Sequence, residues 1–381
     1  MVLVAGESLS FYRSYHMWER SGFLQVEGHV GSEIRFLYRC DNIGRVSPTN
    51  EYASVQSLAI MGTWKLEEHS MSNSASMNDL WYIVLHGGDD GIGDNIWSYD
   101  AAGNLVSNAV LETSQVHLQE LRGFAVLRSG AILHFGPAKD RQTPRQFRGV
   151  FTSTKTSPGL KHPFNLIMGP DGNIYASNQD TNAVTRYYGP GSSHVPGTPM
   201  PPPKPDYPLD IFLQSARVVP TGVKEIRDIL FGPDGCLYVA DEDRNEVRQY
   251  DGKNGEYLRT ITNQNDGLDA PVHLLISPDK AHLYIGSSQN DKVFRYHFST
   301  GHVKTFVHSG DGGLKATGGM AFDNDGWFYV VSRLTNQILR YTQSDGTPDK
   351  KPFINIVPKA LSRDRAYNPE FIALVKVPTG Q

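Results

Sequence analysis

The chain is long, nearly neutral and poor in cysteine. Its 381 residues suffice for several ordinary domains or for one large all-β domain. Its 36 basic and 40 acidic side chains give a formal charge of −4, and this balance does not indicate nucleic acid or an anionic membrane as a partner. The two cysteines, Cys40 and Cys236, exclude a disulfide framework and a cysteine metal site, and they fit a reducing compartment.

The first 18 residues mix apolar side chains with Glu7, Ser8, Ser10 and Arg13. They contain neither the unbroken apolar stretch of a signal peptide nor a membrane-spanning segment. We therefore expect a cytoplasmic protein that binds neither membranes nor nucleic acid.

Short β-like runs follow in the N-terminal third of the chain. Residues 34–46 read IRFLYRCDNIGRV, a run followed by a polar loop, and residues 80–99 contain a run and an alternating strand. Residues 121–135, LRGFAVLRSGAILHF, contain two runs joined by a Ser-Gly turn. Each is a partial copy of a unit that is clearer further along the chain.

Three later segments share one pattern: an apolar run, an Asp-Gly turn, a second apolar run, a polar loop, and an alternating run that ends in tyrosine. They read FNLIMGPDGNIYASNQDTNAVTRY (164–187), RDILFGPDGCLYVADEDRNEVRQY (227–250) and GGMAFDNDGWFYVVSRLTNQILRY (318–341). A fourth copy, VHLLISPDKAHLYIGSSQNDKVFRY (272–296), has Asp-Lys in the turn. Because Asp-Gly supplies the positive φ of a tight hairpin, each copy predicts a small antiparallel sheet.

Such a sheet cannot bury both of its faces alone, so the copies must stack around an axis as the blades of a β-propeller. An aromatic residue or histidine in the second strand marks each copy, and successive markers lie 41–52 residues apart, apart from one step of 63. The markers are residues 38, 82, 134, 175, 238, 284 and 329. They predict an all-β propeller of seven blades in one domain over residues 1–381, or of six blades if residues 1–50 only cap the ring.

The long step contains residues 189–208, with the run PGTPMPPPKPDYP. Since proline lacks the backbone donor of a sheet, these residues predict an insertion between strands. At the C-terminus, residues 368–374 read NPEFIAL and resemble a first strand without its partners. We expect this segment to pair with the strand near Ile34 and to close the ring, which would remove exposed sheet edges.

The GPDG-type blades, with the connectors NQNDGLDAPVH (263–273) and SGDGGLKATGG (309–319), resemble the NHL-repeat and streptogramin-lyase-like propellers. They are more distantly similar to the gluconolactonase group. The resemblance covers residues 120–345 and implies a scaffold on which lyases, lactonases, isomerase-like enzymes and binding proteins occur. The Trp-Phe-Thr-Glu type motif of the lyases and the Pro-Asn-Gly-Leu type motif of the calcium-binding gluconolactonases have no match here, so no catalytic residue carries over.

A candidate site comes from the columns of the repeat. Equivalent positions in successive first strands lie on one arc around a propeller axis. Six residues before the turn, this column contains Asn165, Asp228 and His273 in three consecutive copies. Further charged candidates near the same end of the strands are Arg122, His162, Arg227 and Glu370.

Three interpretations of these residues stay open. Asn165, Asp228 and His273 could hold one divalent cation, calcium or magnesium, on the axis. Alternatively His273 is a general base that Asp228 orients, and Arg227 or Arg122 stabilises a developing oxyanion, with Glu370 and His162 completing the catalytic set. In the third interpretation these side chains only form hydrogen bonds that stabilise the structure, and they take no part in chemistry.

The mixed charges favour an enzyme that acts on a polar small molecule by elimination, lactone hydrolysis or isomerisation. The missing family motifs favour the alternative, a non-catalytic propeller that binds a ligand or a protein. The sequence leaves the substrate and the oligomeric state open.

Overall fold

A computed structural model of the chain describes residues 23–27, 35–39, 79–86, 94–118, 121–124, 126–127, 130–356 and 368–377. The chain divides into two compact units, residues 10–73 and the remainder. In the smaller unit, β1 (Phe23–Glu27) pairs antiparallel with β2 (Arg35–Arg39). The single domain predicted over residues 1–381 stays a prediction. Among the described residues, no helix has the length and apolar character needed to span a membrane.

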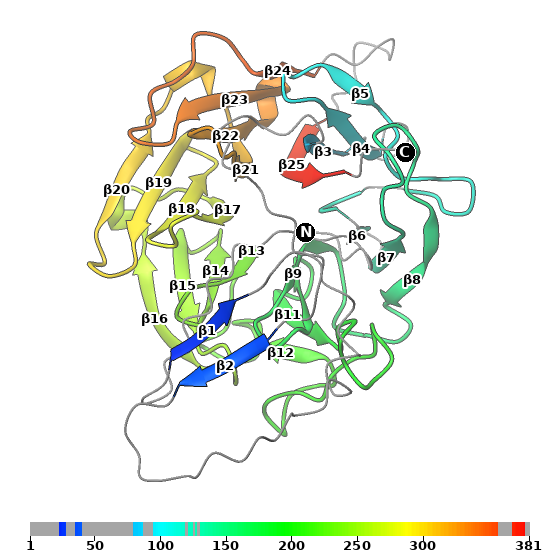
Figure 1. Ribbon diagram of the computed structural model, residues 1–381. Coiled ribbons are helices and arrows are strands. Elements are labelled where there is room, and N and C mark those ends of the chain that lie inside the picture. The colour runs from blue at the N-terminus through cyan, green and yellow to red at the C-terminus, as the bar shows by residue number, and fades with distance from the viewer. Residues whose placement is uncertain are drawn as a thin grey trace. The chain divides into compact units, whose positions relative to one another are not determined.

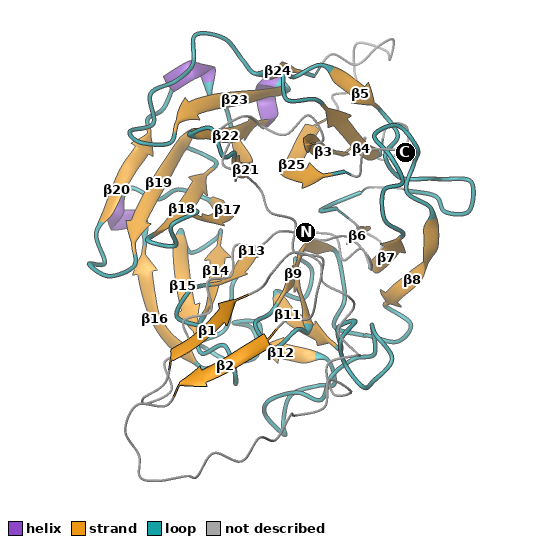
Figure 2. Ribbon diagram, in the orientation of Figure 1, coloured by secondary structure: helices purple, strands orange, loops and turns teal. Residues whose placement is uncertain are grey.

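The larger unit contains five four-stranded antiparallel sheets and one three-stranded sheet among its described residues (Figure 1; Figure 2 separates strands from loops). The first two four-stranded sheets are β9 (Pro163–Met168), β10 (Ile174–Asn178), β11 (Ala183–Tyr187) and β12 (Ile211–Leu213), and β13 (Ile226–Phe231), β14 (Leu237–Asp241), β15 (Glu246–Tyr250) and β16 (Tyr257–Thr262). The next two are β17 (Pro271–Ile276), β18 (His282–Ser287), β19 (Lys292–His297) and β20 (Val303–Val307), and β21 (Thr317–Phe322), β22 (Trp327–Ser332), β23 (Gln337–Thr342) and β24 (Ile354–Asn355).

The fifth sheet is β25 (Asn368–Lys376), β3 (Asp79–His86), β4 (Asn95–Tyr99) and β5 (Leu105–Ser107), and the three-stranded sheet is β6 (Val126–Leu127), β7 (Ala131–Phe135) and β8 (Phe147–Ser153). Three single-turn 3-10 helices, Gln264–Asp266, Asp311–Gly313 and Arg333–Thr335, lie in connecting loops. The predicted all-β propeller is confirmed, with five four-stranded blades among the described residues. The seven sequence markers lie in strands of seven different sheets, but the count of seven blades is not confirmed.

The predicted partner of the C-terminal strand is wrong. β25 pairs with β3, from Asn368 opposite His86 to Lys376 opposite Asp79, whereas the strand near Ile34 pairs with β1. The reason is the length and burial of β3. Seven of its eight residues are buried, so the backbone groups on both edges of this strand need hydrogen-bond partners. The nine-residue strand β25 pairs with one of these two edges. Closure of a complete ring stays a prediction.

The first strands β9, β13, β17, β21 and β25 are neighbours in that order and lie on the inner side of their blades (Figure 1). The hydrophobic core lies between blades. One cluster, for example, joins Tyr175 and Phe212 of the β9–β12 blade to Ile229, Val239 and Tyr250 of the β13–β16 blade. This packing explains why the runs of the repeat are apolar on both faces of each sheet.

The Asp-Gly turns have the predicted geometry and an additional role. Gly235 has φ 76°, and the carboxylate of the preceding Asp234 accepts a hydrogen bond of 2.9 Å from the hydroxyl of Tyr238. The same bond joins Asp171 to Tyr175 (3.0 Å). In the turn that contains Asp325-Gly326 the acceptor is Asp323, two residues before that pair, and the bond from the Tyr329 hydroxyl is 2.8 Å long. In each of these blades an aspartate of the turn therefore accepts the hydrogen bond of the hydroxyl group of the buried marker tyrosine.

The polar loops between second and third strands connect neighbouring blades. The side-chain oxygens of Asn182, Asn245 and Asp291 accept hydrogen bonds from the backbone N–H groups of Ile226 (3.1 Å), Ala270 (2.7 Å) and Ala316 (2.7 Å), each at the start of the next blade. All three acceptors have left-handed φ angles, of 51°, 53° and 57°. Short Asn and Asp side chains tolerate that conformation, which aims the oxygen away from their own strand. We call these contacts inter-blade latches.

Candidate functional site

Asn165, Asp228 and His273 meet, as the column predicts. The Nδ2 of Asn165, on β9, donates a hydrogen bond of 2.6 Å to Oδ1 of Asp228, on β13. The Nδ1 of His273, on β17, lies 3.6 Å from Oδ2 of Asp228. The same carboxylate accepts the backbone N–H groups of Ile229 (2.8 Å) and Leu274 (2.9 Å). Asp228 thus joins the first strands of three blades.

Two of these three residues are enclosed by their neighbours, and Asn165 is half-buried. Asp228 is 4% exposed and His273 is 2% exposed, and the His273 ring lies edge-on to Phe371 with ring centroids 4.6 Å apart. Both oxygens of Asp228 already accept hydrogen bonds, and no group of three or more acidic, histidine or cysteine side chains in the described part of the chain has a metal-binding arrangement. This environment favours the structural interpretation of Asp228, and the metal role of Asn165, Asp228 and His273 stays a prediction.

A cavity of 460 Å³, which we call the central pocket, lies beside this cluster and is lined by residues of four first strands. These are Phe164 on β9, Arg227 on β13, Val272 on β17 and Glu370 on β25. The other lining residues come from loops and are Arg122, His162, Gln179, Asp180, Glu225, Glu242 and Arg333. Because the first strands are the innermost ones, the pocket lies at the centre of the larger unit.

Four of the six predicted catalytic residues line the central pocket: Arg122, His162, Arg227 and Glu370. Asp228 and His273 are not among its lining residues. The physical reason is the alternation of side chains along a strand, which sends neighbouring residues to opposite faces. Arg227 and Val272 therefore line the pocket, while the residues that follow them pack away from it.

Arg227 organises the charges of the pocket. Its Nη2 lies 3.0 Å from Oε1 of Glu225 and also forms an ion pair with Oε2 of Glu242. Across the pocket, Nε of Arg333 lies 3.0 Å from Oε2 of Glu370, whose side chain is only 3% exposed. The ring of His162 is 3.0 Å from the carboxylate of Asp180. The pocket is therefore a set of paired charges of both signs.

Glu242 is the residue of this set with an altered proton affinity. Burial raises its pKa above the ordinary value of 4.5, and the neighbouring carboxylate of Glu225 raises it further, against the opposing effect of Arg227. Two carboxylates that share one guanidinium, one of them partly desolvated, form a site that can hold and release a proton. The arrangement can thus act as a general base.

The sequence-based candidates did not include Glu242, Arg333, Gln179 or Asp180. All four directly follow second strands, which end at Asn178, Asp241 and Ser332. Because the second strand runs antiparallel to the first, its last residues lie beside the start of the first strand. A comparison of the residues that follow the second strand in each copy of the repeat would have identified them.

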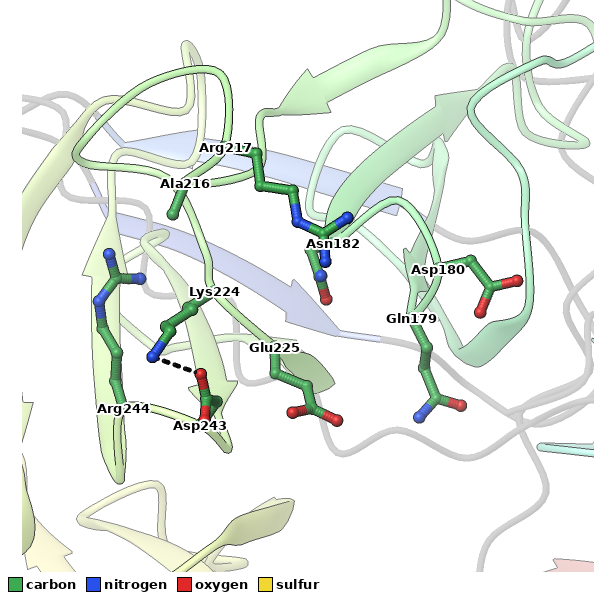
Figure 3. Close-up of a pocket in the computed structure, with 9 residues that line it drawn as sticks. All are labelled: Gln179, Asp180, Asn182, Ala216, Arg217, Lys224, Glu225, Asp243 and Arg244. Carbon is green, nitrogen blue, oxygen red and sulfur yellow. Dashed lines mark ion pairs between the residues drawn. The ribbon is translucent and has the colours of Figure 1, made fainter.

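A second cavity, of 770 Å³, adjoins the central pocket and is lined by nine residues shown in Figure 3. We call it the outer cleft. It shares Gln179, Asp180 and Glu225 with the central pocket, so the two cavities lie side by side at these residues.

Comparison with known proteins supports the fold. No protein-family model matches the sequence, and no curated protein matches it either. Solved structures do match it. A chain of the nidogen/laminin complex has a TM-score of 0.51 at 9% identity, over 79% of this chain and 100% of that one. The chain is a β-propeller.

Two further neighbours of this propeller are gluconolactonase proteins by description. A candidate 6-phosphogluconolactonase from Bacteroides fragilis has a TM-score of 0.48 at 14% identity, over 80% of this chain and 100% of that one. The periplasmic gluconolactonase of Pseudomonas aeruginosa has a TM-score of 0.48 at 13% identity, over 78% and 100%. The word gluconolactonase describes those two proteins only, and the NHL-repeat and streptogramin-lyase resemblance is not confirmed. At these identities the likeness concerns the fold alone.

Proposed function

We propose that the chain is an enzyme that performs acid/base chemistry on a polar small molecule in the central pocket, and that its reaction is the hydrolysis of a lactone. The observation that carries this proposal is the shared pairing of Glu225 and Glu242 with Arg227, together with the raised pKa of Glu242. A carboxylate of raised pKa is a stronger base than an ordinary glutamate.

In the proposed reaction Glu242 removes a proton from water while the water oxygen attacks the lactone carbonyl carbon. The electron pair of the C=O bond moves to its oxygen, and an arginine of the pocket, Arg122 or Arg333, stabilises that oxyanion. When the carbonyl re-forms, the ring C–O bond breaks and Glu242 returns its proton to the alkoxide. One water is added and a hydroxy acid leaves.

Elimination and isomerisation fit the same pocket less well. Both require removal of a proton from carbon, which is far less acidic than the water that attacks an activated ester with general-base assistance. A glutamate whose pKa is raised by burial is suited to the easier proton transfer. Lactone hydrolysis is therefore the reaction that these groups support best.

The test is a panel of five- and six-membered sugar lactones assayed with the wild type and with Glu242→Gln. The variant should lose at least about 100-fold in kcat/KM, the usual contribution of a general base. Glu256→Gln, a change at an exposed glutamate in the β15–β16 turn, is the matched control and should keep full activity. Full activity of Glu242→Gln, or no hydrolysis of any lactone by the wild type, would refute the proposal.

The alternative is a propeller that binds a ligand without transforming it. The pairing of Arg227, Arg333 and His162 with carboxylates favours it, because paired charges also suit recognition of a polar ligand. A ligand from the same panel that binds but is recovered unchanged would support this alternative.

A further inference from the structure

The outer cleft lies between two blades and takes its lining from three connecting segments. Gln179, Asp180 and Asn182 come from the loop after β10, and Asp243 and Arg244 come from the loop after β14. Ala216, Arg217, Lys224 and Glu225 come from the connection between β12 and β13. Both this cleft and the central pocket fall within the range of about 300–1,000 Å³ that is typical of ligand sites. Together they offer room for a substrate of two parts.

Most charges of the outer cleft are paired within the protein. Nη1 of Arg244 lies 2.8 Å from the fully buried carboxylate of Asp241 and donates to the carbonyl of Gly222. Asp180 and Glu225 form ion pairs with residues of the central pocket. These groups shape the cleft, but their charges are already compensated.

Arg217 is different. Its side chain is exposed, and none of the described residues forms a hydrogen bond or an ion pair with its guanidinium. In Figure 3 it extends from its loop on the side of Asn182, while the Lys224 side chain points to Asp243. A guanidinium placed in this way can bind an anionic group with two parallel hydrogen bonds.

Lys224 is a second available cation. Its Nζ lies 2.6 Å from Oδ2 of Asp243, but the two side chains are 57% and 45% exposed. Exposed pairs of this kind contribute little to stability, so exchanging Asp243 for a ligand costs little. Asp243 itself repels an anion that enters the cleft.

We infer that the outer cleft is a subsite for an anionic group, a carboxylate or a phosphate, and that Arg217 and Lys224 bind it. The anion belongs to a substrate whose reacting part occupies the central pocket. This assignment of the substrate class rests on the proposed function, whereas anion binding in the cleft does not depend on catalysis.

The first experiment titrates inorganic phosphate and, separately, acetate into the full chain at low ionic strength, with calorimetric detection. Arg217→Ala should weaken binding of the preferred anion about tenfold or more, as expected for loss of a charge-assisted bond. Arg217→Lys should keep part of the affinity. Asp243→Asn should strengthen binding, because it removes a negative charge and releases Lys224.

Lys253→Ala is the matched control, since Lys253 is an exposed cation in the β15–β16 turn of the same blade. It should leave both titrations unchanged. Phosphate binding without acetate binding would identify a phosphate subsite, and the reverse would identify a carboxylate subsite. Equal affinity of wild type and Arg217→Ala, or no binding of either anion, would overturn the inference.

The second experiment compares a neutral sugar lactone with its phosphorylated and carboxylated counterparts as substrates. Arg217→Ala should raise KM for the preferred anionic lactone about tenfold and leave the neutral one unchanged. If no lactone is hydrolysed, the proposed function fails while the anion titrations still decide the subsite. If hydrolysis depends on Glu242 but not on Arg217 with any of the lactones, the subsite fails and the proposed function stands.

Discussion

Asn165 and Asp228 belong to neighbouring blades, and a hydrogen bond of 2.6 Å from Nδ2 to Oδ1 joins them. The other carboxylate oxygen of Asp228 accepts the backbone N–H of Leu274 in the next blade. A single buried side chain therefore joins three first strands beside the central pocket. Because side chains alternate along β13, Asp228 faces this junction and the preceding Arg227 faces the central pocket.

The first prediction concerns this junction. Asp228→Ala should lower the free energy of unfolding by about 3 kcal/mol, because it leaves buried donors of Asn165 and Leu274 without an acceptor. Urea denaturation measures the loss, and Asp206→Ala, at an exposed site in the proline-rich insertion, is the control. A loss of activity with unchanged stability would instead support the catalytic role predicted for Asp228.

The second prediction concerns the pH profile of lactone hydrolysis. Because Glu242 must be ionised and its pKa is raised, kcat/KM should fall as the pH drops through a midpoint above 4.5. Arg227 lowers that pKa and Glu225 raises it, so Arg227→Gln should move the midpoint to higher pH and Glu225→Gln should move it to lower pH. Midpoints that shift in the same direction would contradict the assignment of Glu242 as the base.

The third prediction separates the two properties of an inter-blade latch. Asn245 has φ 53° and accepts the N–H of Ala270 at 2.7 Å. Asn245→Gly keeps the backbone conformation and loses only the hydrogen bond, so it should cost about 1 kcal/mol. Asn245→Ala also strains the backbone and should cost about 2 kcal/mol or more. Thermal and urea unfolding of both variants measures the difference, and equal losses would exclude a role for the φ angle.

The fourth prediction concerns the proline-rich insertion, residues 189–208, which lies between β11 and β12. Gly197 has φ 87°, and a Cβ atom there would lie 1.9 Å from the carbonyl oxygen of Phe151 on β8. Gly197→Ala should therefore lower the free energy of unfolding by about 2 kcal/mol or more. Gly191→Ala, where no atom lies within 4 Å of the added carbon, should have little effect.

A loss at Gly197 beyond the roughly 1–2 kcal/mol that its left-handed φ alone costs an alanine would show that the insertion packs on the blade of β8. It would contradict the expectation from the proline content that removing residues 189–208 leaves stability nearly unchanged. Equal stability of the two glycine variants would support that expectation instead.

The repeat by itself determined the architecture, because its information is local. The Asp-Gly turns and apolar runs specify hairpins within about 25 residues, and the tyrosine column predicted the second strands from Tyr175 to Tyr329 correctly. The rotation that relates the copies also predicted that Asn165, Asp228 and His273 would meet. Both results follow from spacing along the chain.

Only the tertiary structure decided the partner of β25 and the composition of the pocket. The choice of β3 over the strand near Ile34 depends on which buried edge is available, and that is a property of the folded sheets. The ion pair between Glu242 and Arg227 joins a residue after β14 to a residue of β13. The alternation of side chains along β13 turns Asp228 away from the central pocket. Which side of a strand faces a cavity depends on contacts between blades, and the pattern of a single repeat does not contain that information.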